Sequence, residues 1–287
     1  MVDEVLERQQ WLEPVETGVQ RGVAGAFDAA GAAGRVAKNA LHGVWLGHPL
    51  HPVLTDIPLG SWTAAVVLDA MEAAGQKGVA RGADLAVQIG ILGAVGAAVT
   101  GLTDWQATDG RARRVGIVHG LLNTVALSLM TASHFARKGR HRGAGRGLAL
   151  AGFAIGGVSA WLGGHLVYRE QIGVDHAVGT NPPEGWTAVL DEGELREGEP
   201  RRAMAGEAKV LLVRRNGEIF AIGEVCSHLG GPLAEGKLEG ETIECPWHGS
   251  RFCVRDGSVV DGPATHPQPQ FETRVNAGKI EVRAKVQ

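Results

Sequence analysis

Long uncharged runs dominate the first half of the chain. Three of them contain no Asp, Glu, Lys or Arg over 19, 22 and 22 residues, at positions 85–103, 115–136 and 147–168. Each run reaches the ~20 residues that an α-helix needs to cross ~30 Å of hydrocarbon. A fourth candidate at 52–74 is weaker because its uncharged part, residues 57–68, has only 12 residues. Beside three spans, we expect it to complete a four-helix transmembrane bundle.

The segment that precedes the bundle, residues 1–50, has a periodicity of its own. Val19, Val23 and Phe27 recur every four residues with charged residues between them. This pattern favours an amphipathic helix that lies on a membrane surface. A loose segment rich in Ala and Gly is the equal alternative. The first ten residues are polar and acidic without an apolar core, so we expect no signal peptide there.

Polarity and period change in the second half of the chain. After a Pro-containing linker at 171–185, short β runs meet at Asn216-Gly217, at Asp256-Gly257 and at residues 276–278. Such turn residues join antiparallel strands into hairpins. The sequence therefore predicts a multidomain protein with an N-terminal interfacial segment, a four-helix transmembrane domain and an all-β domain. Their predicted ranges are 1–50, 51–170 and 186–287.

Composition narrows the possible functions. Glycine makes up 43 of 287 residues, about twice its usual share of ~7%. Small residues let membrane helices approach closely, and five glycines of the predicted spans stand at such spacings: Gly90, Gly93, Gly96, Gly152 and Gly156. A net charge of −3 without a basic stripe argues against phosphate-driven nucleic-acid binding. Three cysteines cannot form an even-numbered disulfide framework, which indicates metal ligation or a reducing compartment.

Two cysteines and two histidines form a paired motif in the β half. Cys226 and His228 have one residue between them, and after sixteen further residues Cys245 and His248 have two between them. Two loops that bring two thiolates and two imidazoles together can hold a two-iron, two-sulfide cluster, with Cys on one iron and His on the other. The same four side chains also suit a tetrahedral zinc ion.

The residues around this motif distinguish a two-iron cluster site from a zinc site. Glycine-rich tails at 230–233 and 249–252 follow the two pairs, and Gly262-Pro263-Ala264 stands where a third loop would cover the site. With this pattern the second half of the chain resembles the Rieske [2Fe–2S] family. The resemblance implies one [2Fe–2S] cluster, with the two cysteines on an inner iron and the two histidines on an outer iron. It also implies four residues around the cluster: Trp247, Gly249, Ser250 and Pro263.

Three positions depart from the respiratory members of that family. Gly231 and Trp247 stand where those members carry a disulfide-bonded cysteine pair, and Phe252 replaces a tyrosine. Fewer hydrogen bonds towards the cluster favour a reduction potential in the lower part of the Rieske range of ~ −150 to +300 mV. The sequence thus resembles a Rieske ferredoxin, which carries electrons and has no catalytic site of its own. For Cys253 we expect only the role of a small apolar side chain.

The transmembrane domain carries a second resemblance. Its stretch His48-Pro-Leu-His-Pro52 and the later Thr-Asp104-Trp resemble an uncharacterised family of bacterial four-helix membrane domains over residues 45–170. An up-and-down bundle gathers six ionisable residues at one membrane face: His48, His51, Asp56, Asp104, His119 and His165. Three roles are open for them. His119 and His165 could ligate a haem b, the cluster could bind and deprotonate a quinol, or the side chains hydrogen-bond helix ends together.

These features predict a membrane-anchored electron-transfer protein. We expect it to sit in membrane lipid and to pass single electrons between a quinone or haem and a redox partner protein. The alternatives are a cluster-based redox or iron sensor and the anchored ferredoxin component of an oxygenase. Seven basic residues on one side of the bundle against six on the other do not fix its orientation. Without an export signal or a protective disulfide, we expect a bacterial inner-membrane protein with its β domain on the cytoplasmic side.

Overall fold

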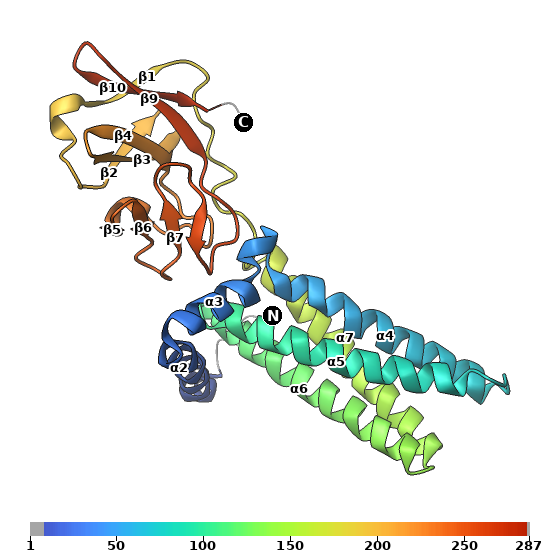
Figure 1. Ribbon diagram of the computed structural model, residues 1–287. Coiled ribbons are helices and arrows are strands. Elements are labelled where there is room, and N and C mark those ends of the chain that lie inside the picture. Colours follow the sequence, from blue (N-terminus) through green and yellow to red (C-terminus); the bar gives the residue numbers. More distant parts are fainter. Residues whose placement is uncertain (1–8, 286–287) are drawn as a thin grey trace. The chain divides into compact units, whose positions relative to one another are not determined.

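The structure, a computed structural model, describes residues 9–285 of the chain (Figure 1). It divides into two compact units. One contains the chain up to Gly34 together with Leu50–Gln171, and the other contains Arg35–Pro49 together with the chain from Ile172 onwards. Residues 1–8, where no signal peptide is expected, lie outside the described part.

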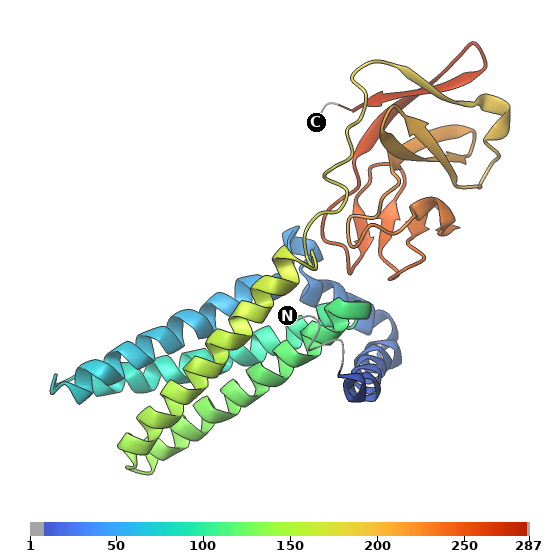
Figure 2. The same ribbon diagram turned by 180° about the vertical axis from the view of Figure 1, so that it is seen from behind.

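Four long helices make up most of the first unit within the described residues. They are α4 (Leu50–Ala73), α5 (Ala80–Trp105), α6 (Gly110–Lys138) and α7 (Arg142–Tyr168). All four are long and apolar enough to cross a membrane, which confirms the three strong predicted spans and the weaker fourth. Short connections make successive helices antiparallel neighbours, and the four run side by side in both views (Figures 1 and 2).

Glycines lie where the helices approach one another. A Cβ atom added at Gly90 of α5 would lie 2.1 Å from Nε1 of Trp62 on α4. One added at Gly152 of α7 would lie 3.1 Å from the carbonyl oxygen of Ala126 on α6. The close approach that the glycine spacing predicts is therefore present in both helix pairs.

A shorter helix, α2 (Glu13–Ala29), packs against the ends of α5 and α6. It follows a single turn, η1 (Gln10–Leu12). Its Glu16 is fully buried and forms ion pairs with Arg114 and, at 3.1 Å, with Arg113. The segment is thus helical rather than loose, and buried ion pairs fix this helix to the bundle.

The next helix belongs mostly to the second unit. α3 (Gly31–His42) is followed by the turn η2 (Val44–Leu46), and residues 35–49 group with the β strands. Gly43 and Gly47 flank η2 with φ angles of 84° and 72°, a left-handed conformation that glycine adopts without strain. These two glycines let the chain turn sharply on both sides of η2.

Ten short strands in residues 187–284 form two antiparallel sheets of the second unit (Figure 2). The six-stranded sheet has the order β1-β10-β9-β4-β3-β2, and the four-stranded sheet has the order β5-β6-β7-β8. The larger sheet consists of β1 (Thr187–Asp191), β2 (Arg201–Ala205), β3 (Ala208–Arg215), β4 (Glu218–Gly223), β9 (Gln270–Asn276) and β10 (Lys279–Ala284). The smaller consists of β5 (Lys237–Glu239), β6 (Thr242–Glu244), β7 (Arg251–Cys253) and β8 (Val259–Asp261).

Two of the predicted hairpin turns are confirmed. Asn216 and Gly217, with φ angles of 54° and 79°, join β3 to β4. Ala277 and Gly278, with φ angles of 48° and 75°, join β9 to β10. Positive φ at both central residues is the mark of a type I′ turn, whose twist matches that of the strands. The third predicted turn lies in the longer connection between β7 and β8.

The core of the β unit extends to the loops that carry the paired motif. One buried cluster contains Leu211, Ile222 and Phe252 together with Cys226 and Cys245. The two cysteines are therefore held by the same packing that holds the sheets. The predicted fold class, a four-helix transmembrane bundle followed by an all-β domain, is confirmed.

Candidate metal centre

The paired motif lies on two loops that have the same backbone hydrogen bonds. In the first loop Gly230 N–H donates to the Cys226 carbonyl, and Cys226 N–H donates to the carbonyl of Gly231, both at 2.9 Å. In the second loop Gly249 N–H donates to the Cys245 carbonyl at 3.1 Å, and Cys245 N–H donates to the residue five positions ahead at 2.8 Å. Each cysteine thus begins a closed turn of the same size.

Glycine is required in both turns. Gly230 and Gly249 have φ angles of 78° and 74°, and residues with a Cβ atom rarely adopt such angles. A Cβ atom at Gly231 would lie 2.7 Å from Sγ of Cys245. The glycine-rich tails of the motif therefore serve the backbone, and the position of Gly231 leaves no room for a larger residue beside the thiol.

The two thiols lie together beneath the loops. Cys226 and Cys245 are 1% and 3% exposed. The Cys226 thiol donates a hydrogen bond to Cys245, which lowers the pKa of Cys245 to about 7 despite burial and raises the pKa of Cys226. A thiolate is the form that binds a metal, so this pair is suited to ligation.

The two imidazoles lie against each other. The rings of His228 and His248 have centroids 5.0 Å apart and are nearly perpendicular. Burial, followed by the charges of nearby histidines, lowers the pKa of His228 to about 3, so the ring is neutral and can bind a metal. Its Nδ1 atom is buried and has no hydrogen-bond partner among the described residues. A buried nitrogen of this kind fits a metal ligand.

The four donors form one pair of sulfurs and one pair of imidazoles. A two-iron cluster of mixed ligation requires two cysteines on one iron and two histidines on the other. The residues present fit a [2Fe–2S] cluster, and their pairing favours it over the zinc alternative.

The residues expected around the cluster lie on the second ligand loop and on the third loop. Ser250 is fully buried, and its Oγ accepts a hydrogen bond from Ala264 N–H at 3.0 Å. Pro263 is buried in the third loop, and Trp247 is 57% exposed beside His248. Cys253, for which we expect a purely structural role, is half-buried on β7.

Several residues at the site carry no signal in the sequence. Asn39 bonds to the third loop, fully buried His42 packs against it, and His176 N–H donates to the Ser227 carbonyl at 3.0 Å. His42 and His176 are close enough to His228 to depress its pKa. They come from segments outside the β strands, up to about 190 positions away in the chain. Only the folded chain brings them together.

Five of the six residues predicted at one membrane face lie in the first halves of α4 and α6 or at the ends of α5 and α7, which is the same end of an up-and-down bundle. His51 of α4 and His119 of α6 face each other, with ring centroids 6.3 Å apart. His165 lies 3.6 Å from the carboxylate of Glu170. His48 belongs to the second unit, where its ring lies 5.5 Å from that of His266. Among the predicted acids, Asp56 is exposed and Asp104 is half-buried.

His119 is unsuited to ligate a haem. Its Nδ1 lies 2.8 Å from the carbonyl oxygen of Ser159, and its Nε2 lies 3.0 Å from Nδ2 of Asn123. Both ring nitrogens therefore have hydrogen-bond partners. Haem ligation, one of the three roles left open for these histidines, is not supported, because ligation by His119 would break a buried hydrogen bond.

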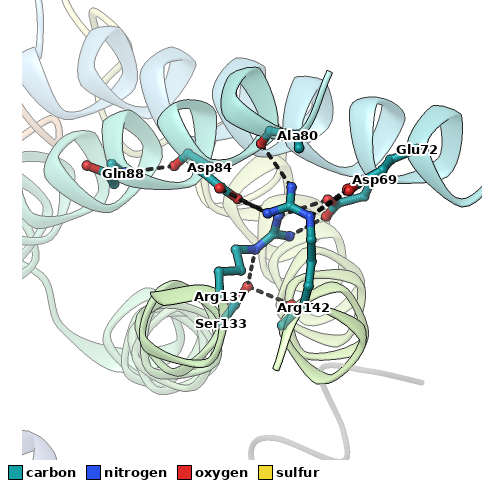
Figure 3. Close-up of polar contacts among 9 residues, drawn as sticks. Asp69, Glu72, Ala80, Asp84, Gln88, Ser133, Arg137 and Arg142 are labelled. Carbon is teal, nitrogen blue, oxygen red and sulfur yellow. Dashed lines mark hydrogen bonds and ion pairs between the residues drawn. The ribbon is translucent and has the colours of Figure 1, made fainter. Parts of the chain in front are cut away.

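A charged network that the sequence does not reveal joins the other ends of the four helices (Figure 3). Arg137 of α6 pairs with Asp69 of α4 and, at 3.1 Å, with Asp84 of α5. Arg142 of α7 pairs with Asp84 at 2.9 Å and with Glu72 of α4 at 2.7 Å. Arg137 and Arg142 are among the seven basic residues counted on one side of the bundle, and both are bound within it.

Family models match both halves of the chain. Residues 185–272 match a Rieske [2Fe-2S] domain, and residues 47–176 match a family of predicted membrane proteins, DUF2231. Both predicted resemblances are confirmed. The two matched ranges together cover the bundle and the metal loops.

Several curated relatives are similar to the Rieske domain of this chain. The chain is 34% identical over 94 residues to the ferredoxin component of biphenyl 2,3-dioxygenase from Rhodococcus jostii, of which it covers 88%. It is 34% identical over 98 residues to ferredoxin CarAc of Metapseudomonas resinovorans, of which it covers 92%. These two matches cover 33% and 34% of this chain, respectively.

A longer relative shares the same region. The chain is 33% identical to human apoptosis-inducing factor 3 over 123 residues, which are 43% of this chain. The chain spans only 20% of the length of that protein. The similarity to it therefore concerns a part of each chain.

Proposed function

The chain belongs to the Rieske [2Fe–2S] family, and from this membership we propose that it is a membrane-anchored protein that carries single electrons to or from a partner protein. The observation that carries the proposal is the pairing of two buried thiols with two adjacent imidazoles on matched loops. When bound there, a [2Fe–2S] cluster accepts and releases one electron at a time.

In this proposal the chain supplies the ligands and their surroundings. Cys226 and Cys245 bind from the buried side, and His228 and His248 bind from the side of the loop ends. Ser250 is oriented by the N–H of Ala264, which its Oγ accepts. Its own hydroxyl hydrogen is therefore free to be donated towards the thiolate side of the site.

Metal analysis and spectroscopy test the proposal. Purified full-length protein should contain iron and acid-labile sulfide in equal amounts. Electron paramagnetic resonance of the reduced protein should show the low average g value of mixed His and Cys ligation. Protein that contains zinc, or no iron, would contradict the proposal.

The membrane partner that we propose is a quinone. His51 supports it, because its Nδ1 lies 2.8 Å from the carbonyl oxygen of Ala97. Nδ1 must carry the proton in such a bond, so Nε2 keeps the lone pair of a base. Ionisable residues in membrane helices commonly mark sites of proton or substrate binding. A quinol that loses electrons also loses protons, and His51 is placed to accept one.

A second candidate function is electron supply to an oxygenase. It is favoured by the relatives, since the Rhodococcus protein is named as a dioxygenase component. In that function the bundle serves as an anchor, and the protein receives electrons from a soluble donor. Reduction of the full-length protein by a quinol would favour the first function, and reduction only by a soluble reductase would favour the second. For both functions, we propose that the β unit lies on the cytoplasmic side of the membrane.

A further inference from the structure

Residues 35–49 pack on the third loop of the metal centre, although more than 200 positions separate them from it in the chain. They precede the transmembrane helices, and the sequence predicts for them only an interfacial role. The structure groups them with the β unit instead. Asn39 and His42 near the end of α3, together with Val44 of η2, lie against Gly262 of this loop.

Both polar atoms of the Asn39 side-chain amide form hydrogen bonds with the third loop. Its Nδ2 donates to Oδ1 of Asp261 at 2.8 Å, and its Oδ1 accepts from Gly262 N–H at 3.0 Å. Two residues further on, Ala264 N–H donates to Oγ of Ser250. A series of hydrogen bonds therefore connects Asn39 to the loop that carries Cys245, because the Ser250 carbonyl accepts from the Cys245 N–H.

His42 fills the space beside the same loop. Its side chain is fully buried, and a Cβ atom at Gly262 would lie only 3.0 Å from its Cδ2 atom. The ring lies within electrostatic range of His228. A fully buried ring at this position occupies space that water would otherwise fill next to an imidazole ligand.

We infer that Asn39 and His42 are positioning residues of the metal centre, which hold the third loop in place and keep water away from the histidine side of the site. The inference rests on the proposed function, because it requires a [2Fe–2S] cluster on the four ligands. It adds two residues from outside the Rieske domain to the set that determines the reduction potential.

The direction of the effect follows from charge. Two ferric ions, two sulfides and two thiolates sum to zero, so uptake of one electron leaves a charge of −1. A buried charge is less stable than a hydrated one, and solvent exposure is one of the factors that set cluster potentials. Shielding by His42 therefore lowers the potential, and its removal should make the cluster easier to reduce.

The test compares three variants of the full-length protein in detergent at one pH. For His42→Ala we expect the reduction equilibrium to shift about tenfold towards the reduced form, which is ~59 mV for a one-electron couple. For Asn39→Ala we expect a shift in the same direction and at least tenfold faster hydrogen exchange at the amide of Gly262. Val36→Ala is the control, because Val36 is 70% exposed on the same helix and should change neither quantity.

The outcomes separate this inference from the proposed function. Wild-type protein without iron and sulfide would overturn the proposed function. If the wild type holds its cluster, unchanged potentials in the loaded His42→Ala and Asn39→Ala proteins would overturn the inference. If the His42→Ala protein does not take up the cluster, the Asn39→Ala protein decides. An unchanged reduction potential and unchanged hydrogen exchange at its Gly262 amide would overturn the inference.

Discussion

Cys245 and Cys253 lie eight residues apart and have different surroundings. Cys245 is a free thiol, 3% exposed and hydrogen-bonded to the thiol of Cys226, whereas Cys253 is half-buried on β7. We expect Cys245→Ser to lose the iron and the visible absorbance, because one ligand of the inner pair is removed. Cys253→Ser is the matched control and should keep both. The same loss in the two variants, measured by iron content and absorbance, would contradict the assignment of the ligands.

Ser250 offers a second comparison between two residues of one type. Its Oγ accepts the N–H of Ala264 inside the site, while exposed Ser258 donates to Asp256 at 2.6 Å. Ser250→Ala removes a donor that stabilises the reduced state, so we expect the potential to fall by an amount equivalent to ~1 kcal/mol. Ser258→Ala should leave it unchanged. A redox titration of both variants measures the difference, and equal potentials would contradict it.

The sequence reveals residues whose chemistry is local. The two Cys and His pairs are visible because each pair lies within one short loop, where spacing and geometry are linked. Asn39 and His42 are not visible, because an Asn and a His at the end of a short helix have no distinguishing pattern. Their role depends on a contact that forms only when α3 packs on the third loop.

At the scale of elements, absence of charge predicts the spans but not their ends. The uncharged run at 115–136 ends before Arg137, yet α6 continues to Lys138. Arg137 remains inside the bundle because carboxylates from two other helices meet its guanidinium. A search for uncharged residues cannot detect such a pair, since its two charges are 68 positions apart.

The network around Arg137 leads to a prediction about the stability of the bundle. Its side chain is 2% exposed, and its removal would leave Asp69, which is itself buried, without its partner. We expect Arg137→Ala to destabilise the bundle by ~3–5 kcal/mol, the usual effect of breaking a buried pair. Lys138→Ala, at the next and exposed position, should change stability by less than ~0.5 kcal/mol.

Thermal unfolding in detergent measures both variants. In a second step, Asp69→Asn in the Arg137→Ala background removes the buried charge and should restore part of the lost stability. An Arg137→Ala protein as stable as the wild type would show that the four helices do not depend on this network.

At the scale of the whole molecule, the two halves differ in how far function can be inferred. The β half has relatives of its own length, and its four ligands follow a recognisable pattern. The bundle matches a family known only as predicted membrane proteins. Its chemistry therefore has to be inferred from side-chain contacts. These direct attention to His51 and away from haem ligation, one of the three roles that the sequence leaves open.

Reconstitution of the full-length protein in liposomes tests that chemistry. A quinol releases two electrons, so one quinol should reduce two molecules of the protein. We expect His51→Ala to slow this reduction at least tenfold, because the base that accepts a proton is lost, while dithionite still reduces the cluster fully. His141→Ala is the control, since His141 is exposed beyond the end of α6. Wild-type protein that no quinol reduces, or His51→Ala protein that reacts as fast as the wild type, would assign the bundle the role of an anchor.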